Sequence, residues 1–156
     1  MTMRLRVPDV QPGAYQAMLG LEKYLATCPV PKRTLELLKL RASQMNGCAF
    51  CVDMHAHDLM ADGETDERLH TVATWRDAPW FTQSERAALA LTEEATRLDP
   101  GGVSDETWAE AEKHYGPTEL GALVTAIATI NAWNVINVTV RTTPGLLRGA
   151  TSAATA

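Results

Sequence analysis

The spacing of proline and glycine constrains the fold of this sequence most, because both residues interrupt regular structure. The intervals between them carry apolar residues at helical spacing, and no two intervals form a convincing pair of strands. We therefore predict an all-α, single-domain helical bundle of about seven helices. Their expected positions are residues 12–26, 33–45, 48–60, 65–75, 82–98, 104–115 and 117–141.

The length of 156 residues suits one domain, in which folding would bury about two-thirds of the surface that the unfolded chain exposes. We expect residues 1–142 to form the helical domain. After Arg141 the sequence is TTPGLLRGATSAATA, which is mostly small and polar. Residues 143–156 are therefore expected to be a flexible tail.

Residues 120–140 carry no formal charge and are numerous enough to span a membrane. Asn131, Asn134 and Asn137 recur within this run at every third position, and three threonines accompany them. So many amides and hydroxyls would be costly in lipid. We predict a buried helix at a subunit contact, and no membrane partner.

The formal net charge of −5, with scattered lysine and arginine, argues against nucleic acid as a partner. No apolar run follows the two arginines near the start, so a secretory signal is not expected. The three cysteines, Cys28, Cys48 and Cys51, cannot all pair within the chain. These features favour a cytoplasmic location, where a C-x-x-C pair is more often catalytic or metal-binding than structural.

The segment from Glu36 to His55, ELLKLRASQMNGCAFCVDMH, carries the candidate chemistry. Asn46-Gly47 predicts a turn, which places Cys48 in the first turn of a new helix, where free N–H groups and the helix dipole favour a thiolate. Cys51 is within disulfide reach of Cys48, and His55 lies one turn further along the same face, where an imidazole can accept a thiol proton. If the two helices fold back on each other, Glu36 can orient His55.

A zinc site is the main structural alternative for this segment. Cys48 and Cys51, with His55 or His57, would supply two or three ligands. A structural zinc site normally needs four, and no second cluster of cysteine or histidine is evident. We therefore expect no metal and no cofactor.

Several other residues have structural interpretations. Cys28 is best explained as a small apolar residue near a helix end. Trp75, Trp80 and Phe81 could line an apolar entrance for organic peroxides, but such clusters more often belong to the core.

The segment resembles the core motif of the alkylhydroperoxidase D family, also called carboxymuconolactone decarboxylase-like proteins. The positions that match are Glu36, Ser43, Gly47, Cys48, Cys51 and His55. The blocks ASQMNGCAFCVDMHAHDL, TWRDAPWFTQSERAALALTEEATRL and INAWNVINVTVR resemble one branch of these proteins, so most of the chain is covered.

The resemblance implies an all-helical fold, assembly into trimers or hexamers, and a peroxide-reducing thiol cycle. In that cycle Cys51 attacks the peroxide, Cys48 resolves the sulfenic acid as a disulfide, and a thioredoxin-like or lipoyl-bearing dithiol protein reduces the pair. His55 and Glu36 would form the proton relay. The helix dipole by itself favours Cys48 as the thiolate, but it contributes only about 0.3–1 kcal/mol, so we assign the attack to Cys51.

The predicted function is therefore a peroxiredoxin-type oxidoreductase acting on hydroperoxides. One alternative is a redox-responsive binding protein in which Cys48–Cys51 oxidation alters packing without turnover. A second is a lactone decarboxylase, which is less expected because family members with that activity generally lack the cysteine pair.

Overall fold

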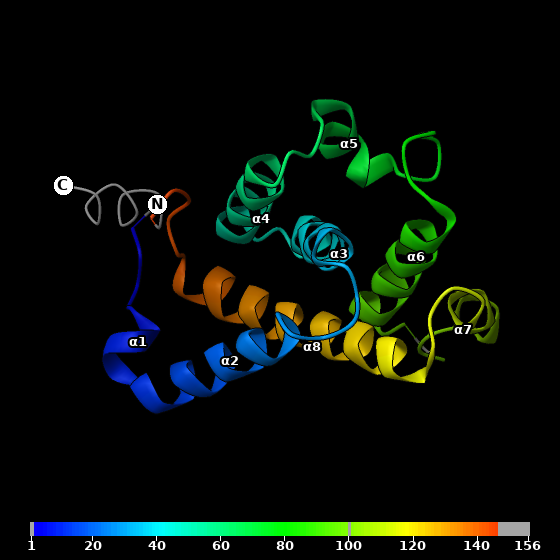
Figure 1. Cartoon of the computed structure of the whole chain (residues 1–156). Helices are drawn as coiled ribbons and strands as arrows, with labels where there is room; N and C mark the ends of the chain where they lie inside the picture. The colour runs from blue at the N-terminus through cyan, green and yellow to red at the C-terminus, as the bar shows by residue number, and fades with distance from the viewer. Residues whose placement is uncertain (1, 100, 147–156) are drawn as a thin grey trace.

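Helix α3 (Lys32–Met45) runs through the middle of the molecule, and α4, α6 and α8 pack around it (Figure 1). The computed structural model describes residues 2–99 and 101–146. Within these residues there are eight α-helices, one 3₁₀ turn and no strand, which confirms the all-α fold. The remaining elements are α1 (Val7–Val10), α2 (Pro12–Leu25), α4 (Ala49–Ala61), α5 (Asp66–Thr71), η1 (Val72–Thr74), α6 (Gln83–Arg97), α7 (Asp105–Glu112) and α8 (Pro117–Val140).

The helices begin and end close to the predicted positions, with two differences. The segment predicted at 65–75 is divided into α5 and η1, because Thr71 leaves the helical region of the backbone with φ −101° and ψ 4°. Helix α1 was not predicted. It is only four residues long, which is too short to show a periodic apolar pattern.

Helix α3 is enclosed on nearly every side. The buried residues between positions 34 and 43 include Glu36 and Lys39 as well as four leucines. An amphipathic helix would keep such charges in water, but contacts from α4, α6 and α8 bury most of α3 after its exposed first turn. A buried charge destabilises the folded state unless it is paired, so Glu36 and Lys39 need partners inside the bundle.

The aromatic cluster belongs largely to the core. Trp75 and Phe81 are buried in a hydrophobic cluster with Leu40 and Leu59, as the core interpretation predicts. Trp80 is half exposed. None of the three lines the cavity described below, so the alternative of an apolar entrance was wrong.

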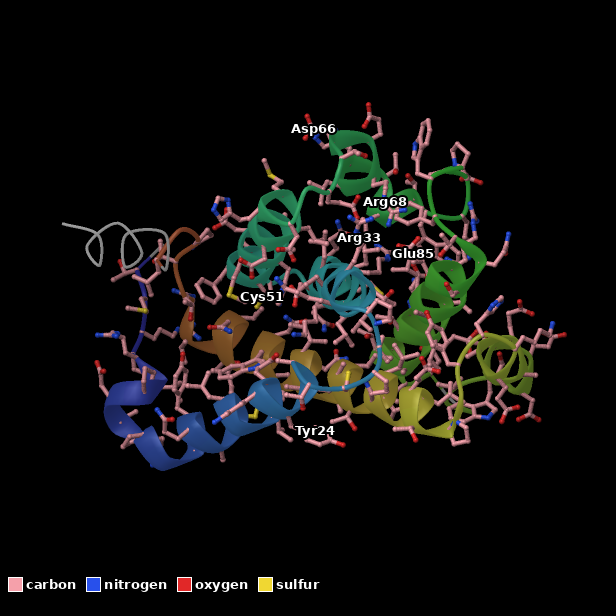
Figure 2. The ribbon with its side chains drawn as sticks, in the orientation of Figure 1. Tyr24, Arg33, Cys51, Asp66, Arg68 and Glu85 are labelled. Atoms are coloured by element: carbon pink, nitrogen blue, oxygen red, sulfur yellow. A yellow bond between two sulfur atoms is a disulfide. The ribbon has the colours of Figure 1, made fainter. Side chains whose placement is uncertain are left out.

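The junction between α5 and α6 is held by charged side chains. Thr82 and Glu85 form a capping box at the start of α6. Arg68 on α5 donates hydrogen bonds to Glu85, at 2.6 Å, and to Glu64, at 2.9 Å. Figure 2 shows Arg68 and Glu85 between the two helices.

Helix α8 is long and apolar enough to cross a membrane by length and composition, but in this structure it packs against α2, α3, α4 and α6. Its asparagines bind inside the bundle. Asn46 donates to Asn131 and Asn134 at 2.7 and 2.9 Å, and Asn134 donates to Ser43 at 3.0 Å. The inner face of α8 is therefore buried as predicted, whereas Val135 on its outer face is exposed.

Both described ends of the chain are tied to the bundle. The Arg4 N–H donates to the carbonyl oxygen of Val140 at 2.8 Å, which brings the N-terminal segment to the end of α8. The Gly145 N–H donates to Asp53 Oδ2 at 2.9 Å. Residues 143–146 of the expected tail are thus described and Gly145 is hydrogen-bonded, while residues 147–156 lie outside the described part of the chain.

Candidate active site

The turn between α3 and α4 places Cys48 directly before α4. Gly47 has φ +66°, a conformation that glycine adopts without strain. Cys48 caps the helix, since its Sγ accepts a hydrogen bond from the Cys51 N–H at 3.3 Å. The two cysteines form a disulfide with a Cα–Cα distance of 5.3 Å. The predicted position at the helix start is confirmed, with Cys48 as the cap and not as a first-turn residue.

The two sulfurs differ in their surroundings. Both cysteines are buried, but Cys51 lines a cavity of about 350 Å³ and Cys48 does not. The Asn137 side-chain amide lies 3.7 Å from Cys51 Sγ and is held by a second hydrogen bond to the carbonyl oxygen of Trp133. Figure 2 shows Cys51 on the side of α4 that faces the end of α8. This arrangement supports Cys51 as the sulfur that meets a substrate.

The predicted contact between Glu36 and His55 is present. His55 Nδ1 and Glu36 Oε2 are 2.7 Å apart, and the residues are only 4% and 8% exposed. An ionised carboxylate can only accept a hydrogen bond, so Nδ1 carries a proton, and in the neutral imidazole Nε2 has a free lone pair. Nε2 is buried and has no hydrogen-bond partner among the described residues. This nitrogen is therefore suited to accept a proton from a thiol.

Glu36 remains an anion although it is buried. Burial raises the pKa of Glu36, but the hydrogen bond from His55 and the charges of His55 and Lys39 lower it, and the net pKa is below its ordinary value. The carboxylate is consequently ionised at neutral pH. It can hold the imidazole in the tautomer that leaves Nε2 free.

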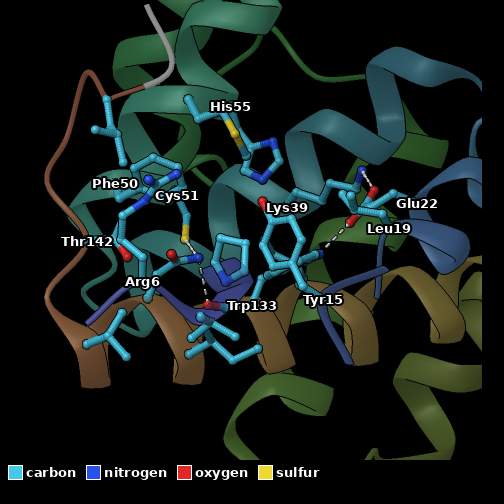
Figure 3. Close-up of a pocket in the computed structure, with 18 of the residues that line it drawn as sticks. Arg6, Tyr15, Leu19, Glu22, Lys39, Phe50, Cys51, His55, Trp133 and Thr142 are labelled. Carbon is cyan, nitrogen blue, oxygen red and sulfur yellow. Dashed lines mark hydrogen bonds and ion pairs between the residues drawn. The ribbon is translucent and has the colours of Figure 1, made fainter. Parts of the chain in front are cut away.

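Lys39 lies on the other side of Glu36, one helical turn away on α3. Its ammonium donates to Glu36 Oε1 at 3.3 Å and to Glu22 Oε2 on α2 at 2.7 Å. The second oxygen of Glu22 accepts from Trp133 Nε1 at 3.1 Å. Figure 3 shows Glu22 between Lys39 and Trp133. Sequence analysis did not single out Lys39, Glu22 or Trp133.

The cavity beside Cys51 is mainly apolar and is built from five parts of the chain: the N-terminal segment with α1, α2, α3, α4, and α8 with the residues that follow it (Figure 3). Tyr15 and Trp133 meet edge to face in its wall, with ring centroids 5.3 Å apart. The other apolar lining residues are Met3, Leu5, Val7, Pro8, Leu19, Phe50, Met54, Ile130, Ile136, Val140 and Leu146. A cavity of this volume and lining has room for an apolar organic molecule.

The zinc ligands considered from the sequence do not come together. His57 is exposed and does not line the cavity, and Cys48 is bonded to Cys51. Glu36, His55 and Asp58 do place ligand-type atoms within 4.8 Å of one another. However, Glu36 and His55 are engaged with each other and Asp58 is exposed, so we assign no metal to this group.

Cys28, the third cysteine, does not line the cavity beside Cys51, but it lines a second cavity together with Glu22, Glu36 and Lys39. It is a free, partly buried thiol that packs against the core cluster around Leu38 and Leu123. The interpretation as a small apolar residue near a helix end is confirmed, since α2 ends at Leu25.

The matches with known proteins agree with this architecture. The sequence model of the carboxymuconolactone decarboxylase family matches residues 12–94. The uncharacterized protein YdfG of Bacillus subtilis (strain 168) is 36% identical over 138 residues, which are 88% of this chain and 94% of YdfG.

Two solved structures are similar in fold. ATU0492 of Agrobacterium tumefaciens, a protein of unknown function assigned provisionally to antioxidant defence as AhpD, has a TM-score of 0.89 and 33% identity, covering 93% of this chain and 99% of that one. The debrominase Bmp8, solved in complex with 2,3,4-tribromopyrrole, has a TM-score of 0.79 at 18% identity, covering 93% of this chain and 78% of that one. At that identity, the second similarity concerns the fold alone.

Proposed function

The chain belongs to the carboxymuconolactone decarboxylase family, and on that premise we propose that it is a thiol-dependent peroxidase that reduces hydroperoxides. One observation carries the proposal. Cys51 and His55 line the same cavity, and Glu36 holds the imidazole so that its buried Nε2 is free to accept a proton. A nucleophile beside an oriented base is the arrangement that covalent catalysis needs.

The catalytic cycle begins with both cysteines reduced. His55 takes the Cys51 proton, and the thiolate attacks the outer peroxide oxygen. The O–O bond breaks, the alcohol leaves with the proton that His55 returns, and Cys51 becomes a sulfenic acid. The Cys48 thiol then attacks this sulfur, water leaves, and the Cys48–Cys51 disulfide forms. The disulfide in the structure corresponds to this oxidised end of the cycle.

A dithiol protein, thioredoxin-like or lipoyl-bearing, would return the pair to its reduced form and so supply two electrons for each turnover. We place the protein in the cytoplasm, where such donors are kept reduced. The proposed enzyme works as a homo-oligomer, a trimer or a hexamer, and needs no metal or cofactor.

The proposal is tested by adding one equivalent of cumene hydroperoxide to the reduced protein, followed by thiol titration and mass spectrometry. Wild type should lose two thiols and form a Cys48–Cys51 bridge. Cys48→Ser should stop at a Cys51 sulfenic acid that dimedone traps, Cys51→Ser should lose nearly all reactivity, and Cys28→Ser should match wild type. If Cys51→Ser consumed peroxide as fast as wild type, the proposal would be wrong.

Two other functions make different predictions. A redox-responsive binding protein would oxidise once and stop, so steady-state peroxide consumption with a dithiol reductant separates it from an enzyme. A lactone decarboxylase, the activity in the family's name, would not need a thiol and should survive Cys51→Ser. The disulfide and the oriented imidazole support a thiol mechanism over the decarboxylase. The redox-responsive binding protein uses the same cysteine pair, so the turnover measurement decides between it and the peroxidase.

A further inference from the structure

A row of hydrogen-bonded groups crosses four helices and ends at the proposed base. It runs from Trp133 on α8 to Glu22 on α2, then to Lys39 and Glu36 on α3, and finally to His55 on α4. Each carboxylate uses its two oxygens for two different neighbours. Glu22 binds Trp133 and Lys39, and Glu36 binds Lys39 and His55.

The ammonium in the middle of this row is shielded from water. The Lys39 side chain is 8% exposed, against 27% for Glu22. Burial lowers the pKa of Lys39, but the charges of Glu36 and Glu22 outweigh that effect and leave the pKa raised, so Lys39 is a cation at neutral pH. Charges in such surroundings act on each other more strongly than at the surface, because solvent screens them less.

We propose that Lys39 is a positioning residue for the Glu36–His55 pair, and that Glu22 sets how strongly Lys39 acts on it. This inference rests on the proposed function, because it concerns the base that activates Cys51. The positive charge of Lys39 beside Glu36 opposes the binding of an extra proton by the Glu36–His55 pair. His55 therefore stays neutral, and able to accept the proton of Cys51, at a lower pH than it would without Lys39. Glu22 neutralises part of that charge.

The other ionisable groups near the pair come from each of the elements that pack around it. On α4 they are Cys51 and Asp58, whose carboxylate belongs to the group within 4.8 Å of Glu36 and His55. Arg6 and Tyr15 line the same cavity from the N-terminal segment and α2. Cys28 and Lys32 line a second cavity with Glu36 and Lys39, and Lys32 also interacts with Glu36 through its charge. Lys39 is distinguished from these groups by its direct hydrogen bond to Glu36.

Opposite charge changes should therefore move the reactivity of the thiol in opposite directions. The measurement is the rate of iodoacetamide alkylation of reduced Cys51 between pH 4 and 9, in a Cys28→Ser, Cys48→Ser background. In the plot of alkylation rate against pH, Lys39→Met should shift the rising limb to higher pH by about one unit. At a given pH on that limb, the reaction is then roughly tenfold slower. Glu22→Gln should shift this limb to lower pH, and Lys39→Arg should leave it near its wild-type position.

The matched control is Arg41→Met. Arg41 is another largely buried cation of α3, but it pairs with Glu93, at 2.6 Å, and does not line the cavity. It should cost stability without moving the profile. A general loss of packing would shift all three neutralising variants alike, or shift none of them, and cannot produce the opposite signs expected for Lys39→Met and Glu22→Gln.

If the profiles of Lys39→Met and Glu22→Gln coincide with wild type while His55→Ala still changes it, the inference is wrong and the proposed function stands. If His55→Ala also leaves the profile unchanged, the base assignment itself fails. Should Lys39→Met not fold, Glu22→Gln decides the question, because it only replaces one carboxylate oxygen by an NH2 group. A downward shift supports the inference, and no shift or an upward shift overturns it.

Discussion

Two histidines on α4 show how neighbouring residues of one type receive different roles. His55 is buried and bonded to Glu36, whereas His57, two positions later, is exposed. The difference arises because two positions along a helix correspond to a rotation of about 200° around its axis. Only one of the two histidines can therefore face α3. The proposed role of base therefore fits His55 and does not fit His57.

We expect His55→Ala to slow alkylation of reduced Cys51 at pH 7 by tenfold or more, because the thiol loses its proton acceptor. His57→Ala should leave the rate unchanged. Stopped-flow alkylation of the reduced proteins, monitored at pH 7, measures both. An unchanged rate in His55→Ala would contradict the base assignment.

Asn137 is a residue of the candidate site that sequence analysis missed. Its amide was noted only as one of three regularly spaced asparagines that argue against a membrane helix. In the structure it points to Cys51 Sγ at 3.7 Å, while Asn131 and Asn134 bind Asn46. The asparagines along this edge of α8 therefore have two kinds of partner: Asn131 and Asn134 bind Asn46 in the turn before Cys48, and Asn137 faces the sulfur of Cys51.

At the scale of elements, α6 is attached to the bundle by buried carboxylates. Glu93 accepts hydrogen bonds from Arg41 at 2.6 Å, from Trp75 at 3.0 Å and from Arg76. Burial raises the pKa of Glu93, but these donors lower it, and the net pKa is below its ordinary value. Glu85 behaves in the same way, with Arg68 as its main donor.

This arrangement makes stability depend on pH with a definite sign. A carboxylate whose pKa is lower in the folded state binds fewer protons than in the unfolded chain. Its contribution is complete above the ordinary value of 4.5 and is lost as pH falls toward the folded value. We therefore expect Tm to be level near neutral pH and to fall below about pH 5.

Glu93→Gln should lower Tm at pH 7, since Arg41 and Arg76 lose their anion, and should reduce the further loss of stability in acid. Glu110→Gln is the control, because Glu110 is a half-exposed residue of α7 whose ion pair with Lys113 lies at the surface. Thermal unfolding followed by circular dichroism from pH 3 to 8 measures both variants. A Glu93→Gln curve parallel to that of wild type at all pH values would contradict this explanation.

At the scale of the whole molecule, α8 and α2 present apolar side chains that the described chain leaves uncovered. Val135 and Val138 on α8 are 68% and 47% exposed, and Tyr24 on α2 is 63% exposed. Figure 2 shows Tyr24 pointing away from the bundle. Apolar surface of this kind is typical of subunit contacts, in agreement with the proposed homo-oligomer.

We expect wild type at micromolar concentration to sediment as a trimer or hexamer. Val135→Glu should shift it toward smaller species, because the contact would then bury an unpaired charge. Trp80→Glu is the control, because Trp80 is half exposed in the loop before α6, away from this face. Analytical ultracentrifugation of the three proteins is the measurement. A wild-type protein that remains monomeric would contradict the assignment.

The local features of this protein could be predicted from the sequence. Proline and glycine mark the ends of the helices, Asn46-Gly47 marks the turn before Cys48, and the intervals of three and four residues place Cys48, Cys51 and His55 together. These features depend on backbone conformation over one or two turns, which neighbouring residues determine. The motif also indicated the family.

Only the tertiary structure decided which distant groups meet. Glu36 and His55 are 19 positions apart, and Asn137 and Cys51 are 86 apart. The burial of α3 on nearly every side, which pairs Lys39 with Glu22 and Glu36, depends on how four helices pack. Packing of that kind is a property of the whole chain, because each helix buries its apolar surface against partners that its own sequence does not specify.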